Sequence, residues 1–67
     1  MELSVNGQSR VVTDGLTAAE LLQQLAVAPE RVVVEVNLQI LKRAQLPETV
    51  LCPGDQVEIV QFVGGGA

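Results

Sequence analysis

Residues 56–67 read Gln-Val-Glu-Ile-Val-Gln-Phe-Val-Gly-Gly-Gly-Ala. From 56 to 62 the residues alternate with the period of a β-strand, with Val57 and Ile59 on one face and Val60 and Phe62 on the other. Three consecutive glycines follow, and their backbone entropy disfavours both a strand and a helix. The stretch therefore predicts a last β-strand over residues 56–62 and a flexible C-terminal tail over residues 63–67.

The N-terminal segment predicts a β-hairpin. Residues 2–6 alternate as a strand, and Asn6-Gly7 is a strong turn signal because both residues tolerate positive φ. We expect the second strand over residues 9–13, before Asp14-Gly15 breaks it.

A helix follows the hairpin. Thr17 and Glu20 have the spacing of a capping box, in which each side chain accepts a hydrogen bond from the other residue's amide. Apolar residues then recur at helical spacing, whereas Gln23 and Gln24 are expected to face water. Because Pro29 cannot continue a helix, we expect the helix to end near residues 25–26.

The second half of the chain predicts further strands. Residues 31–37 are rich in valine and indicate a strand inside the sheet. A short strand is expected around Ile40 and an extended piece after residues 47–50. Cys52-Pro53-Gly54-Asp55 is typical of a tight turn before the last strand.

This order of elements predicts the α+β class, with a mixed sheet of four to five strands packed on one main helix. The first and last strands are expected side by side at the centre of the sheet. Residues 1–62 would form this one domain, and residues 63–67 the flexible tail.

Composition argues against several classes of function. The chain has 67 residues, no histidine and one cysteine, Cys52, so a histidine-dependent catalytic triad cannot form and a zinc site lacks ligands. A net charge of −4 and a single aromatic residue disfavour nucleic-acid binding. No stretch resembles a membrane span or a signal peptide, and the absence of disulfides suits the cytoplasm. We therefore expect a cytoplasmic protein that is not an enzyme, binds no metal, and contains a passive Cys52.

The glycine tail offers two physical uses. Without Cβ atoms, Gly64, Gly65 and Gly66 can thread a narrow channel in a partner and present an ionised main-chain carboxylate. Such a carboxylate can attack the α-phosphate of ATP, and a thiol or persulfide can then displace AMP. Taken alone, a glycine-rich end is more often a frayed terminus or a linker remnant.

Residues 54–66 resemble the end of bacterial thiamine-biosynthesis sulfur carrier proteins. Val5-Asn6-Gly7, the helix start at residues 17–22, and residues 34–37 preceding Ile40 are similar too, so that the resemblance spans nearly the whole chain. It implies the ubiquitin-like β-grasp fold.

The resemblance also implies a mechanism and its partners. A ubiquitin-activating-like adenylyltransferase, using ATP and magnesium, would adenylate Gly66, so this chain itself would bind no cofactor. A cysteine desulfurase or another persulfide donor would supply sulfur for a thiocarboxylate. Thiazole synthase would then use that sulfur to form the thiazole of thiamine. Related carriers serve molybdopterin synthesis or tRNA thiolation, and ubiquitin-like modifiers share the fold; these are the alternatives.

Two further expectations concern the residues around Gly66. The family chemistry needs a terminal glycine, yet Ala67 follows Gly66. If Ala67 is trimmed or is an artefact, Gly66 carries the thiocarboxylate; if Ala67 persists, either it is adenylated itself or the chain is inactive. We expect the attachment at Gly66. Val60, Phe62 and Val63 are expected to contact a partner, with packing of Phe62 at the sheet edge as the alternative. Asp55 and Glu58, taken to lie near the tail, are weaker candidates for pairing with basic residues of the adenylating enzyme.

Overall fold

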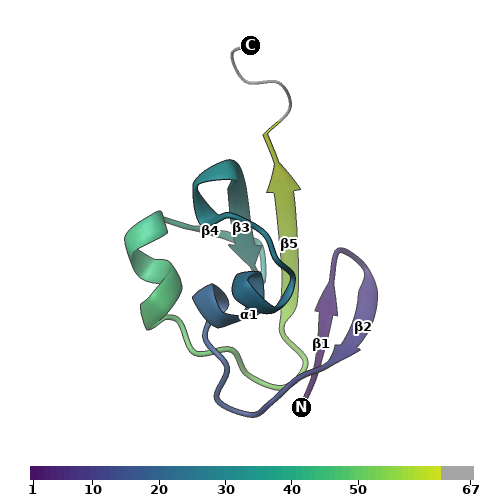
Figure 1. Ribbon diagram of the computed structural model, residues 1–67. Helices are drawn as coiled ribbons and strands as arrows, with labels where there is room; N and C mark the ends of the chain where they lie inside the picture. Colours follow the sequence, from purple (N-terminus) through teal and green to yellow (C-terminus); the bar gives the residue numbers. More distant parts are fainter. Residues whose placement is uncertain (63–67) are drawn as a thin grey trace.

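A computed structural model describes residues 1–62 as one mixed sheet with a helix packed on one face (Figure 1). The order of the five strands in the sheet is β2-β1-β5-β3-β4. In chain order the elements are β1 (Glu2–Val5), β2 (Gln8–Val11), α1 (Ala18–Gln24), η1 (Pro29–Arg31), β3 (Val32–Val36), β4 (Gln39–Leu41), η2 (Arg43–Glu48) and β5 (Gln56–Gln61).

The last strand occupies the middle of the sheet. β5 runs parallel to β1, with Val5 opposite Val57, and antiparallel to β3, with Val34 opposite Ile59. The predicted adjacency of the first and last strands is therefore confirmed. The valine-rich strand β3 lies inside the sheet between β5 and β4, also as predicted.

The helix begins at the predicted capping box. Glu20 N donates to Thr17 Oγ1 at 3.1 Å, and Thr17 N donates to Glu20 Oε1 at 2.9 Å. Leu25 is the C-cap, and Gln23 and Gln24 are exposed, as the periodicity predicted. The cap satisfies amides at the start of the helix that have no partner within the helix itself.

The core lies between α1 and the sheet. Its most completely buried large side chains come from the helix, from two strands and from the segment before the last turn: Leu3, Leu21, Leu22, Leu51 and Val57. Burial of these side chains supplies the main favourable free energy of folding, because apolar surface leaves water.

The turns follow the glycine and asparagine signals. Asn6 and Gly7 have φ values of 50° and 80°, which gives the hairpin turn its two left-handed residues. Gly54 has φ of 84° in the turn that precedes β5, where Asp55 N donates to Cys52 O at 3.1 Å. Both predicted turns are confirmed.

Three expectations about the elements were inaccurate. Arg31, expected in the valine-rich strand, lies in the unpredicted 3-10 helix η1, and β3 begins at Val32. β2 spans Gln8–Val11 rather than residues 9–13, because a two-residue turn places Gln8 directly opposite Val5. The 3-10 helix η2 was not predicted; it precedes the extended residues 49–50 and buries Leu46. At its first turn, Lys42 N donates to Gln45 Oε1 at 2.7 Å.

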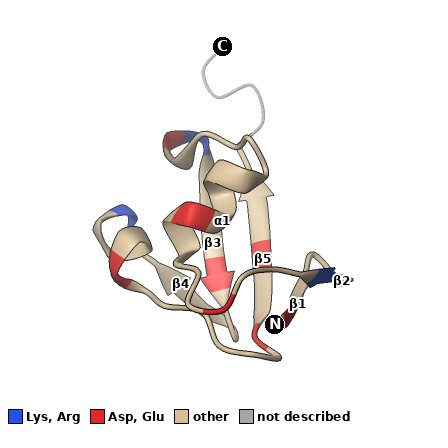
Figure 2. Ribbon diagram, turned by 60° about the horizontal axis from the view of Figure 1, so that its bottom comes forward, with Lys and Arg blue, Asp and Glu red and all other residues tan. Residues whose placement is uncertain are grey.

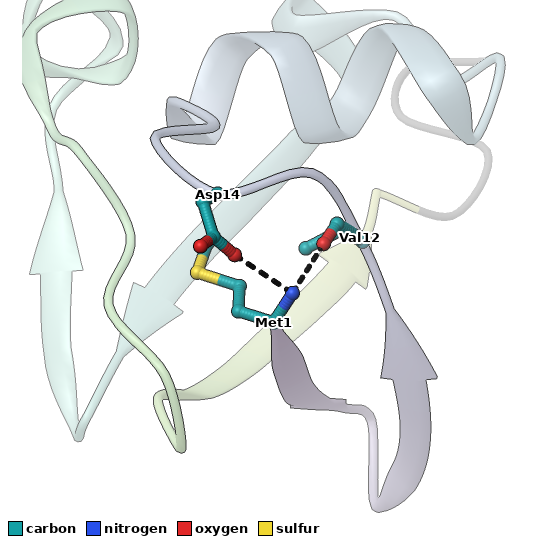
Figure 3. A network of polar contacts seen from close by, with 3 residues as sticks. All are labelled: Met1, Val12 and Asp14. Atoms are coloured by element: carbon teal, nitrogen blue, oxygen red, sulfur yellow. Dashed lines mark hydrogen bonds and ion pairs between the residues drawn. The ribbon is translucent and has the colours of Figure 1, made fainter.

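The segment after β2 is fastened to the start of β1 (Figure 3). The Met1 ammonium donates to Val12 O at 2.6 Å and lies 2.9 Å from Asp14 Oδ1. Val12 N in turn donates to Met1 O at 2.8 Å. These contacts hold the chain in place as it leaves the hairpin for the helix.

Candidate functional site

β5 leads directly into the predicted tail, so the candidate site begins where this strand ends. Val60 and Phe62 are 57% and 59% exposed and share the parity of the sheet face opposite the helix. Both predicted contact residues are thus accessible on one surface. Val63, Gly64, Gly65 and Gly66 lie outside the described residues.

Neighbouring strands fix the position of this surface. Phe62 N donates to Arg31 O at 2.9 Å, and Val60 lies opposite the half-buried Val33 of β3. The backbone of β5 is therefore held by β3 up to Phe62, while the Val60 and Phe62 side chains remain largely uncovered within residues 1–62.

A pair of carboxylates lies next to these apolar residues on the same face. Glu35 of β3 is directly opposite Glu58 of β5, and the two acidic positions appear side by side in Figure 2. The chain's basic residues are all outside these two strands, on β2, in η1 and at the start of η2: Arg10, Arg31, Lys42 and Arg43. Since like charges directly opposite each other are unfavourable, the pair favours a basic neighbour.

Asp55 does not lie near the tail, so the expectation about its location was wrong. It precedes β5, at the opposite end of that strand from Phe62. Its carboxylate accepts from Asn37 Nδ2 at 3.0 Å and from Cys52 N at 2.8 Å. Asp55 therefore stabilises the turn that starts β5.

Sequence reasoning missed two asparagines that position β5. Asn6 Oδ1 accepts from Ile59 N at 2.7 Å and Asn6 Nδ2 donates to Ile59 O at 3.2 Å. Asn37 Oδ1 accepts from Gln56 N at 2.9 Å. Both have positive φ, at 50° and 51°, so each turns the chain while its side chain binds β5. The signal in the sequence was asparagine directly after a strand, and it was interpreted only as a turn former.

The part of the chain that the structure describes contains no group of three or more His, Cys, Asp or Glu residues able to hold a metal ion. Cys52 is a free, exposed cysteine, and its passive role stays a prediction. No helix within residues 1–62 combines the length and apolar character needed to cross a membrane.

Comparison with known proteins identifies the family. The model of the ThiS family matches residues 3–66, which includes all of the sheet except Glu2, together with the predicted attachment residue Gly66. The chain belongs to the ThiS family. The resemblance predicted from the sequence is thereby confirmed.

Full-length ThiS relatives align over nearly the whole chain. The sulfur carrier protein ThiS of Escherichia coli is 32% identical over 98% of this chain and 100% of its own length. The ThiS of Bacillus subtilis is 37% identical over 96% of this chain and 98% of its own length.

A second kind of relative is much longer. The thiazole synthase of Paramagnetospirillum magneticum is 37% identical over 100% of this chain, but the aligned part is only 21% of that protein. This chain thus spans about a fifth of the thiazole synthases that it matches.

A solved structure confirms the fold. The crystal structure of the thiamine biosynthesis protein ThiS from Geobacter metallireducens superimposes with a TM-score of 0.85 at 42% identity, covering 98% of this chain and 100% of that chain. The predicted ubiquitin-like β-grasp fold, with a mixed sheet and one main helix, is therefore correct.

Proposed function

We propose that this chain is a sulfur carrier protein of thiamine biosynthesis whose Gly66 carboxylate becomes a thiocarboxylate. The observation that carries the proposal is the family match through Gly66, together with the end-to-end alignment with sulfur carrier proteins named ThiS. Among the sulfur carrier pathways, this supports thiamine over molybdopterin synthesis and tRNA thiolation.

The proposed chemistry takes place on the main chain. The Gly66 carboxylate oxygen attacks the α-phosphorus of ATP, and pyrophosphate leaves, which yields an acyl-adenylate. A persulfide sulfur attacks the acyl carbon and expels AMP. A second thiol then cleaves the sulfur–sulfur bond and releases the thiocarboxylate, forming a disulfide with the donor. ATP and magnesium belong to the activating adenylyltransferase, and a cysteine desulfurase is the proposed origin of the persulfide.

In this proposal the folded body binds partners and performs no catalysis. The described residues supply an exposed apolar pair, Val60 and Phe62, next to the Glu35–Glu58 carboxylates. Val63 continues the chain from that pair toward Gly66, and we assign it to the same partner contact. A partner with apolar and basic residues at its docking face complements this surface.

Thiazole synthase is the proposed acceptor of the sulfur. Two proteins named thiazole synthase contain a segment that aligns with almost all of this chain. Joining two modules in one polypeptide raises the effective concentration of each at the other, which is useful where the modules act on each other.

A mass measurement tests the proposal. The chain ending at Gly66 is incubated with the adenylyltransferase, ATP, magnesium, a cysteine desulfurase and cysteine, then cut before Asp55. The resulting fragment, residues 55–66, contains no methionine or cysteine. It should gain the mass difference between sulfur and oxygen, and this gain cannot arise from oxidation of Met1 or Cys52.

Two controls make the result decisive. Omission of ATP should abolish the mass gain, because no acyl-adenylate forms. Thiazole synthase supplied with the substrates that accept the sulfur, added after removal of ATP, should restore the original mass as sulfur is transferred. An unchanged fragment in the complete mixture would refute the sulfur carrier function, and a covalent adduct to lysines of other proteins would indicate a protein modifier instead.

A further inference from the structure

One edge of β5 is left open near the start of the tail. β1 pairs with β5 only at Ser4–Gln56 and Val5–Val57, so it ends opposite Val57, the second of the six residues of β5. Figure 1 shows the upper part of β5 continuing past the β1–β2 hairpin. On its other side, β5 is paired with β3 along its length.

Backbone direction identifies which groups face the open edge. Asn37 N donates to Gln56 O and Phe62 N donates to Arg31 O, so even-numbered residues of β5 form the ladder with β3. The odd-numbered residues direct their backbone groups toward β1. Val57 O accepts there from Asn6 N, and the Asn6 side chain binds both backbone groups of Ile59.

Gln61 is the next residue on that side. Within residues 1–62, neither its N–H nor its C=O has a hydrogen-bond partner in the direction of β1. Exposed strand edges of this kind accept an added strand, whose main chain supplies the missing donor and acceptor.

A cleft of about 320 Å³ lies beside this edge, on the helix side of the sheet. Its apolar lining comes from β1, from β5 and from the residues just after α1: Val5, Ile59, Leu25 and Val27. Its polar lining includes Arg10 of β2 and Gln61 of β5. Arg10 is the charged residue in this lining, and no carboxylate accompanies it there.

We infer that an extended segment of the activating adenylyltransferase adds as a strand beside β5, pairs with the Gln61 backbone and fills this cleft. Alternate side chains of an added strand point to the helix side. There an apolar side chain can fill the cleft, and a carboxylate can accept hydrogen bonds from Arg10. The inference rests on the proposed function, because that function supplies the partner. Pairing at Gln61 would fix the direction in which the chain leaves the sheet toward Gly66.

A second copy of this chain fits the same edge poorly. Pairing of two β5 edges would offer each cleft the helix-side residues of the other β5, which are Val57, Ile59 and Gln61. None of them is a carboxylate that can meet Arg10, and two chains of net charge −4 repel each other.

Amide hydrogen exchange measured by NMR tests the added strand directly. In the free protein, we expect the Gln61 amide to exchange quickly and the Phe62 amide, which donates to Arg31 O, to be protected. Addition of the adenylyltransferase should slow exchange of the Gln61 amide by roughly tenfold or more while the Phe62 amide stays protected.

Matched variants test the two halves of the site by their affinity for the enzyme. Gln61→Pro removes the N–H without breaking a hydrogen bond of the β3 ladder and should weaken binding about tenfold, whereas Gln61→Ala retains it and should have little effect. Arg10→Glu should also weaken binding. Arg43→Glu makes the same charge change outside the cleft and should not.

The outcomes separate this inference from the proposed function. If the thiocarboxylate forms but the Gln61 amide exchanges equally fast with and without the enzyme, the added strand is refuted and the sulfur carrier function stands. Protection of the Gln61 amide in the free protein would also refute the added strand. If that protection increased with protein concentration, a second copy would be covering the edge; if it did not, the chain's own residues 63–67 would be covering it. Failure of both binding and thiocarboxylate formation would remove the inference and the function together.

Discussion

At the scale of single residues, Thr17 shows how one side chain starts the helix. Its hydroxyl accepts from Glu20 N, and the Glu20 carboxylate accepts from Thr17 N. We predict that Thr17→Ala lowers the free energy of unfolding by about 1 kcal/mol, because the first turn loses its acceptor. In a domain of this size, that loss corresponds to a fall in melting temperature of roughly 4–8 °C.

Thr17→Ser is the matched control for the cap. Serine retains the hydroxyl oxygen, so the variant should unfold close to the wild-type temperature. Equal melting temperatures for Thr17→Ala and the wild type, measured by circular dichroism, would mean that the cap contributes nothing to stability.

At the scale of the elements, β3 and β5 place two like charges opposite each other. Glu35 and Glu58 are direct cross-strand partners on the open face of the sheet. We predict that Glu58→Lys raises the free energy of unfolding by about 0.5 kcal/mol, because repulsion is replaced by attraction. Denaturant unfolding at low salt measures the gain, which should shrink at high salt as screening increases.

A double-mutant cycle isolates this pair. In a Glu35→Gln background, the gain from Glu58→Lys should be smaller, since the opposing carboxylate is gone. A gain of the same size in both backgrounds would assign the effect to some other neighbour of Glu58. Weaker binding of Glu58→Lys to the adenylyltransferase would show that the repulsion is retained for recognition.

At the scale of the whole molecule, we expect the folded body and the tail to contribute separately to stability and to function. Deletion of Gly65 and Gly66 should change the free energy of unfolding by less than about 0.5 kcal/mol, because glycine has no side chain to bury. The same deletion should abolish thiocarboxylate formation. Thermal unfolding and the fragment mass described above measure the two effects.

Deletion of Ala67 alone is the control for the tail. It shortens the chain but leaves Gly66 available, so both folding and sulfur loading should persist. A large loss of stability on deletion of Gly65 and Gly66 would contradict the separation of body and tail.

Local sequence determined most of the elements of this protein. Alternation predicted the first and last strands, and the run of valines predicted the strand inside the sheet. A capping box started the helix, and Asn6-Gly7 and Gly54 marked turns that require positive φ. Each of these signals acts between residues close together in the chain, so it can be recognised without knowledge of the tertiary structure.

The tertiary structure decided which distant residues meet. The sequence did not indicate that Asn6 binds Ile59, that Asn37 donates to Asp55, or that β1 ends early enough to leave the Gln61 edge open. The 3-10 helix η2 likewise depends on burial of Leu46. These features arise from hydrogen bonds and packing between segments far apart in the chain, whose geometry is fixed only when the sheet assembles around β5.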